Sequence, residues 1–270
     1  LENARVLKAD YGHLPALSDI NWDHDVVLAW NGTTSGVCLP GPEAIPASHD
    51  GLVICDATSA AFAMDLPWDR LDVVTWSWQK ALGGEAAHGM IALSPRAVQR
   101  LEAYQPPRGL PKIFRMTSKG ALIDGIFKGD TINTPSMLCV EDALDSLIWA
   151  EAAGGLEGLK ARSRASLAAV TEWVAQADWV EFLASHEAER SSTAICLRIV
   201  APGFVALQRS AQMAVLKNIL ALLEKEGVAF DIGTYRAAPA ALRLWGGATL
   251  EPALVTAPLP CLAWPFVPAS

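Results

Sequence analysis

The chain has 270 residues, of which 51% are hydrophobic and 19% charged, and its formal net charge is −8. Such a composition can bury a large core and is not typical of a disordered chain. The acidic balance, without any block of lysines and arginines, argues against a nucleic acid as partner. No apolar run approaches the roughly 18 residues of a membrane span, so the sequence predicts no membrane-spanning segment.

The cysteines and the N-terminus suggest where the protein is found. Five widely spaced cysteines form no CxxC pair, which indicates a reducing environment with neither a disulfide framework nor a metal site. The first residues include no methionine and no apolar signal region. We therefore expect a cytoplasmic protein, and a chain that is a fragment of a longer one.

Short apolar runs dominate the first half of the chain. The runs at 26–30, 52–55, 73–76 and 90–93 have the length and the nearly continuous hydrophobicity of strands in a mostly parallel sheet that is covered on both faces. After Pro135, apolar residues recur at helical spacing up to a break at Gly154-Gly155, and a second helical pattern covers 156–176. Farther on, the pattern predicts a strand at 194–200, a helix at 211–226 and a strand at 228–232.

This order of elements predicts an α/β fold in three parts. Residues 1–153 would be the C-terminal portion of a large domain, 154–176 a connecting helix, and 177–270 a small α+β domain.

Four polar motifs border these elements. They are Asn31-Gly32-Thr33-Thr34-Ser35-Gly36, Asp56, Ser77-Trp78-Gln79-Lys80, and Asn133-Thr134-Pro135. The first three directly follow predicted strands, and ligands bind beyond the carboxyl ends of parallel strands in open α/β sheets. Each motif by itself is ordinary, because an aspartate can cap a helix and a lysine is usually a solvated surface residue. The ordered combination on neighbouring strands favours a binding site.

The residue types match the requirements of pyridoxal phosphate. A lysine in the cleft can form a Schiff base with the aldehyde of the cofactor. A carboxylate such as that of Asp56 can keep the pyridine nitrogen protonated. Hydroxyl groups and helix N-termini are suited to the phosphate.

The segment from Asp56 to Lys80, with its Ser-Trp-Gln-Lys ending, resembles the phosphoserine aminotransferases of fold type I, class V. The likeness runs from Trp30-Asn31-Gly32-Thr33 to Leu242-Arg243-Leu244-Trp245-Gly246-Gly247-Ala248. Gln79 favours this branch, since related class V enzymes such as cysteine desulfurases usually carry histidine at that place.

The resemblance implies a sheet sandwiched by helices, with the N-terminal part of the large domain missing, and a small C-terminal domain. It implies that Lys80 is the Schiff-base lysine and Asp56 the partner of the pyridinium, with Thr33 and Gln79 in contact with the cofactor. Asn133 and Thr134 would reach the cofactor phosphate of the neighbouring subunit, so the active form would be a homodimer.

Two arginines are candidates for substrate binding. Arg243 would bind the α-carboxylate, because a guanidinium matches a carboxylate bidentately and fold-type-I aminotransferases carry such an arginine in the small domain. Its other interpretation is a surface ion pair. Arg236 lies where the family places basic groups toward the substrate phosphate. For His88 we expect a structural role.

The expected reaction is reversible amino transfer between phosphoserine plus 2-oxoglutarate and 3-phosphohydroxypyruvate plus glutamate, in serine biosynthesis. The family also uses phosphohydroxythreonine in pyridoxine synthesis, and the sequence does not separate the two substrates. Two alternatives stay open. One is another class V enzyme, such as an alanine– or serine–glyoxylate aminotransferase. The other is an inactive fragment, since the family's glycine-rich phosphate loop and stacking aromatic residue have no match here.

Overall fold

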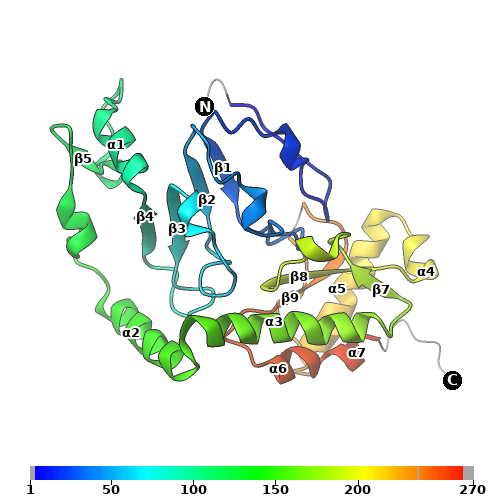
Figure 1. The fold of residues 1–270 in the computed structure, drawn as a ribbon. Helices are drawn as coiled ribbons and strands as arrows, with labels where there is room; N and C mark the ends of the chain where they lie inside the picture. The colour runs from blue at the N-terminus through cyan, green and yellow to red at the C-terminus, as the bar shows by residue number, and fades with distance from the viewer. Residues whose placement is uncertain (1–3, 236, 264–270) are drawn as a thin grey trace.

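The computed structural model describes residues 4–235 and 237–263, which form a four-stranded and a three-stranded sheet joined by two long helices, and a separate two-stranded sheet (Figure 1). In the first sheet, β1 (Val26–Ala29), β2 (Val53–Asp56) and β3 (Val73–Ser77) run parallel. The fourth strand, β4 (Gly89–Leu93), pairs antiparallel with β3. The strand order is β1-β2-β3-β4. The four apolar runs of the sequence therefore form the strands that they predict.

The two faces of the first sheet differ in burial. One face carries Val53, Cys55 and Val74, which lie in a core with Trp30 and Ile45. On the other face Val27 is 70% exposed. Continuous apolar runs predict that other parts of the chain pack on both faces of the sheet. Among the described residues, only one face is packed in this way.

The segment after the first sheet is mostly exposed. Helix α1 (Pro95–Ala103) begins at Ser94, whose Oγ accepts a hydrogen bond from the Ala97 N–H at 3.1 Å, a typical N-cap. The two-residue strands β5 (Thr117–Ser118) and β6 (Ala121–Leu122) pair antiparallel beyond it.

Short 3-10 helices occur along the described part of the chain. They are η1 (Leu17–Asp19), η2 (Pro42–Ala44), η3 (Trp68–Arg70), η4 (Lys112–Phe114), η5 (Asp124–Lys128) and η6 (Glu187–Glu189).

Helices α2 (Met137–Ala152) and α3 (Gly155–Val174) link the two halves of the chain. They are separated at Gly154, which has φ +98°, a left-handed conformation that glycine adopts without steric cost. The break that the sequence predicts at Gly154-Gly155 is thus confirmed. In Figure 1, α3 extends beneath both sheets.

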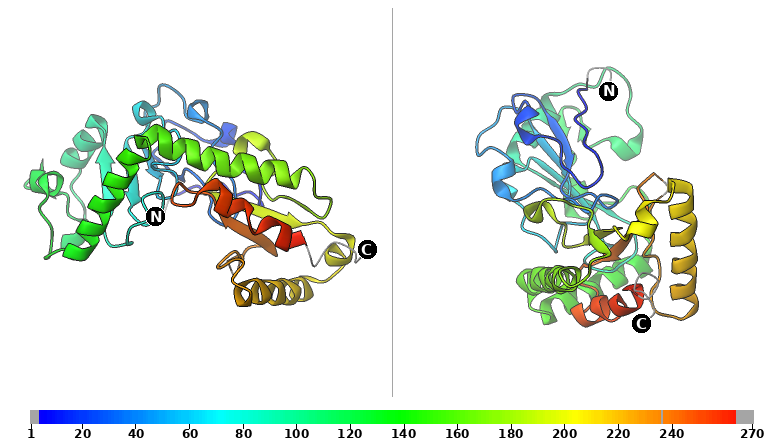
Figure 2. Two further views of the ribbon diagram at one scale, coloured as in Figure 1. Left: turned by 90° about the horizontal axis from the view of Figure 1, so that it is seen from below. Right: turned by 90° about the vertical axis from the view of Figure 1, so that its right-hand side faces the viewer.

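The second sheet consists of β7 (Val180–Phe182), β8 (Ala194–Ile199) and β9 (Ala241–Trp245), all antiparallel. Its helices are α4 (Pro202–Val205), α5 (Arg209–Lys225), α6 (Pro252–Thr256) and α7 (Leu259–Ala263). Ile195, Leu197 and Leu242 share one face and form the largest core together with residues of α3, α5, α6 and α7. Figure 2 shows these helices gathered around the sheet.

One predicted strand is wrong. Residues 228–232 form bends rather than a strand, and the last strand of the second sheet is β9 instead. Asp231 in this segment has φ +51°, a left-handed conformation that interrupts an extended run. Within the described part of the chain, no helix is long and apolar enough to cross a membrane.

Candidate active site

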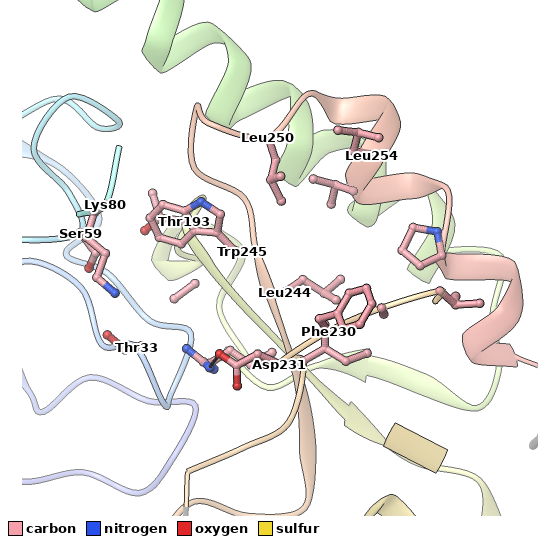
Figure 3. Close-up of a pocket in the computed structure, with 17 residues that line it drawn as sticks. Thr33, Ser59, Lys80, Thr193, Phe230, Asp231, Leu244, Trp245, Leu250 and Leu254 are labelled. Carbon is pink, nitrogen blue, oxygen red and sulfur yellow. Dashed lines mark hydrogen bonds and ion pairs between the residues drawn. The ribbon is translucent and has the colours of Figure 1, made fainter. Parts of the chain in front are cut away.

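A cavity of about 460 Å³ lies between the loops of the first sheet and strand β9 of the second. Thr33, Ser59 and Lys80 line it from the loops that follow β1, β2 and β3. Arg243 and Trp245 line it from β9. Figure 3 shows Lys80 and Ser59 on one side of the cavity, with Trp245 facing them from the other. The carboxyl ends of the parallel strands thus open onto side chains that are remote in the sequence.

A tight turn after β3 brings Lys80 into the wall of the cavity. The Gly83 N–H donates to the Lys80 carbonyl at 3.1 Å, and the Gly84 N–H donates to the Trp78 carbonyl at 3.0 Å. Gly83 has φ +72°, which favours glycine at this position. Lys80 is half-buried, and its Nζ lies 5.7 Å from the centroid of the Trp245 ring.

Asp56 ends β2, next to the strand that leads to Lys80. Its carboxylate is exposed, and Oδ1 accepts hydrogen bonds from the N–H and the hydroxyl of Thr58 at 2.9 and 2.6 Å. The side chain lies outside the set that lines the cavity, whereas Ser59, three residues later, belongs to it. Asp56 and the turn that carries Lys80 thus lie at the carboxyl ends of two adjacent parallel strands.

A buried polar network around Asn31 connects the two halves of the chain. Asn31 Nδ2 donates to Ser191 Oγ at 3.1 Å and to Thr193 Oγ1 at 3.0 Å. Its Oδ1 accepts from Ser59 Oγ at 3.0 Å. All four side chains are buried, and Ser59 and Thr193 line the cavity. The sequence analysis missed this network, because the only local signal was a polar turn after a strand.

Arg243 is held at the cavity by weak polar contacts. Its guanidinium contacts the Asp231 carboxylate at 3.4 Å and the Gly233 carbonyl at 3.4 Å, and it lies 4.6 Å from the centroid of the Tyr235 ring. The Arg243 side chain is 17% exposed, but that of Asp231 is 93% exposed. Arg243 is thus a mostly buried cation whose carboxylate partner is solvated.

Two polar atoms near the turn after β3 are buried without a hydrogen-bond partner among the described residues. They are Oε1 of Gln79, directly before Lys80, and Nε2 of His88. The centroid of the His88 ring lies 4.8 Å from that of Trp78, so the two rings pack against each other. An unpaired buried polar group is costly, and Gln79 Oε1 is available to a donor.

Two of the predicted residues lie on an exposed loop, outside the set that lines the cavity. Asn133 and Thr134 are exposed in the loop before α2. That helix begins after Ser136, whose Oγ accepts a hydrogen bond from the Cys139 N–H. Arg236 lies outside the described residues.

The cysteines near the site are buried thiols. Cys196 faces Arg243 in the register of β8 and β9. Burial raises the pKa of Cys196 to about 12, although the positive charge of Arg243 acts in the opposite direction. Burial and the negative charge of Asp56 raise the pKa of Cys55 to about 12 as well. Over 4–235 and 237–263, no group of three or more His, Cys, Asp or Glu side chains is arranged to hold a metal ion.

No protein-family model matches the chain. The phosphoserine aminotransferase of Methanosarcina mazei is 52% identical over 251 residues, which are 93% of this chain and 65% of that protein. The chain therefore spans just under two thirds of the length of this relative.

Solved structures share the fold. A phosphoserine aminotransferase from Cytophaga hutchinsonii has a TM-score of 0.76 at 19% identity, over 95% of this chain and 68% of that one. The ureidoglycine–glyoxylate aminotransferase of Bacillus subtilis has a TM-score of 0.70 at 17% identity, over 98% and 68%. The fold expected from the sequence, that of the fold-type-I aminotransferases, is confirmed. Since enzymes with different substrates share it, the fold does not select the substrate.

Proposed function

We propose that the chain, which is 52% identical to a phosphoserine aminotransferase over 65% of that protein's length, carries the reaction centre of a pyridoxal-phosphate-dependent aminotransferase. The proposed reaction is amino transfer between O-phospho-L-serine and 2-oxoglutarate. The observation that carries the proposal is the cavity that holds both an amine, Lys80, and a mostly buried guanidinium, Arg243.

The residues that are present fit pyridoxal phosphate. Lys80 is the lysine among the side chains that line the cavity, and Thr33 and Ser59 add hydroxyl groups. Asp56 supplies a carboxylate at the end of the neighbouring strand, where it would face the pyridine nitrogen. Gln79, whose Oε1 has no partner among the described residues, directly precedes Lys80 and is a further candidate contact. These are the residues that would hold the cofactor.

When bound, pyridoxal phosphate supplies an aldehyde that an amine can bind covalently and a ring that withdraws electrons from the bond that breaks. The residues of the chain supply the rest. Arg243 would bind the α-carboxylate of the amino acid in a fork of two hydrogen bonds and so orient the amino group toward Lys80. Nζ of Lys80 would take the proton from the substrate Cα and later return it, as general base and then general acid.

Asp231 and the apolar side chains of the cavity act on substrate entry. The exposed Asp231 carboxylate contacts the Arg243 guanidinium, so an incoming carboxylate has to replace it. Phe230, Leu250 and Trp245 line the same space, and their apolar surface would exclude water around the reacting atoms.

Phosphoserine is preferred over unphosphorylated amino acids in this proposal because the 52% identical relative is named a phosphoserine aminotransferase. The group that would bind the substrate phosphate is Arg236. Phosphohydroxythreonine carries the same phosphate and is a second substrate to test. A preference for plain serine or alanine with glyoxylate would favour the other class V enzymes instead.

A homodimer is part of the proposal. Helix α2 exposes three large apolar side chains, Met137, Leu138 and Ile148, which are 61%, 73% and 67% exposed; exposed apolar surface on one element favours an interface. Asn133 and Thr134 lie in the exposed loop directly before this helix. A partner subunit packed on α2 would receive these two side chains near its own cofactor phosphate.

The proposal also covers location and domain limits. Four of the five cysteines are buried, and all five are free thiols, which supports a cytoplasmic location.

The two main cores lie within the first and the last part of the chain. This separation supports a large domain up to residue 153, a connecting helix over 154–176 and a small domain over 177–270.

The test is a transamination assay on the protein that contains this chain, loaded with pyridoxal phosphate. We expect phosphoserine and 2-oxoglutarate to yield glutamate, and plain serine to react much more slowly. Lys80→Ala should abolish turnover, whereas Lys217→Ala, which removes an exposed lysine from α5, should leave it unchanged. Full turnover by the Lys80→Ala protein would refute the proposed centre, and equal rates with plain serine would refute the substrate.

A further inference from the structure

Trp245 lies close to Lys80 in the cavity and on the same strand as Arg243. It follows Arg243 by two residues on β9, so both side chains point to the same face of the strand. Its ring centroid lies 5.7 Å from Nζ of Lys80, within the range of a cation–π contact. Figure 3 shows the indole facing Lys80 across the cavity.

The indole ring is held in place by its own loop. Nε1 of Trp245 donates to Oγ1 of Thr249 at 3.0 Å. Gly247 lies directly against the ring, since a Cβ at this position would lie 2.1 Å from Cζ2 of Trp245. No other residue type fits beneath the indole without moving it.

The same loop contacts the turn that carries Lys80. A Cβ on Gly83 would lie 2.8 Å from Cγ2 of Thr249, so the Thr249 side chain lies against the Gly83 backbone as closely as glycine permits. Thr249 therefore links the turn of Lys80 to the ring that faces the amine. Thr249 thus contacts both the indole of Trp245 and the turn that carries Lys80.

We propose that Trp245 is a positioning residue for Lys80. The face of the Trp245 ring holds the ε-ammonium group of Lys80 inside the cavity and shields it from solvent. The inference deepens the proposed function, because it concerns the lysine assigned to that reaction. Trp245 acts through Lys80 and through its fixed distance from Arg243 on the same strand. It keeps the amine on the side of the cavity where an amino acid bound to Arg243 presents its amino group.

The experiment measures how fast Lys80 is acetylated by acetic anhydride in the cofactor-free protein, by mass spectrometry of the peptide that contains it. The exposed Lys217 on α5 is the internal reference. Trp245→Leu should raise the rate at Lys80 relative to Lys217 by roughly 2- to 5-fold, the equilibrium constant of a half-exposed cation–π contact. Trp245→Phe, which retains a ring, should restore most of the protection.

Two further variants complete the test. Thr249→Val keeps the indole but removes its acceptor, and it should raise the Lys80 rate by less than Trp245→Leu does. If Trp245→Leu fails to fold, the Lys80 rate in Thr249→Val decides the test. Trp173→Leu is the matched control, because it removes a half-buried tryptophan that packs on Trp179 in the core of the second sheet. It should leave the Lys80 rate unchanged.

Either of two results would overturn the proposal. One is an unchanged Lys80 rate in both Trp245→Leu and Thr249→Val. The other is an equal increase in Trp173→Leu, which would show general loosening of the fold. The measurement involves no cofactor, substrate or turnover, so its outcome is independent of whether the protein transaminates phosphoserine.

Discussion

Arg243→Ala should lower kcat/KM for phosphoserine and for glutamate by similar factors, because both present an α-carboxylate to the same guanidinium. A bidentate, charge-assisted pair is worth about 2–4 kcal/mol. The Arg243 side chain is only 17% exposed, so solvent screens this pair little. The carboxylate of the substrate has to replace that of Asp231, and an ion pair with a 93% exposed partner offsets at most about 1 kcal/mol.

The net loss is therefore about 1–3 kcal/mol, or roughly 5- to 150-fold in kcat/KM. The assay compares both directions of the reaction under substrate-limited conditions, with Arg243→Lys as an intermediate variant that keeps the charge and loses the planar fork. Arg198→Ala is the matched control. Arg198 lies on β8, is paired with Glu181 and does not line the cavity, so its loss should change kcat/KM less than twofold, as expected for an exposed ion pair.

The pattern across substrates decides the assignment. A loss confined to phosphoserine would make Arg243 a ligand of the phosphate and leave the α-carboxylate without an assigned partner. No loss with either substrate would refute substrate binding by Arg243 altogether.

Three other outcomes are expected. Borohydride reduction of the protein loaded with pyridoxal phosphate should leave a pyridoxyl mass on the peptide that contains Lys80, and a label on a different lysine would refute the assignment. Asp231→Asn should lower KM for both amino acids by up to roughly 5-fold, because the exposed carboxylate no longer competes for Arg243; a raised KM would contradict this competition. Since burial raises the pKa of Cys196 to about 12, its thiol stays protonated at pH 8, and iodoacetamide should modify the exposed Cys261 first; faster modification of Cys196 would contradict its burial.

The sequence by itself determined the local elements of this protein. Four continuous apolar runs predict the strands of the first sheet, because short uninterrupted apolar runs are typical of strands in parallel sheets that are covered on both faces. The pair Gly154-Gly155 marks the break between α2 and α3, because glycine alone takes the left-handed conformation there without strain. Lys80 could be singled out because it directly follows a strand, where parallel sheets bind ligands.

Only the tertiary structure decided which distant side chains meet. The bond from Asn31 to Thr193 spans 162 residues, and no local pattern records a hydrogen bond between two turns. Residues 228–232 have the apolar character of a strand, yet the left-handed Asp231 interrupts it and places its carboxylate against Arg243. The contact of Trp245 with Lys80 likewise depends on how β9 packs against the turn after β3. Periodicity reports which face of an element is buried, whereas the partner across a cavity is set by the packing of whole elements.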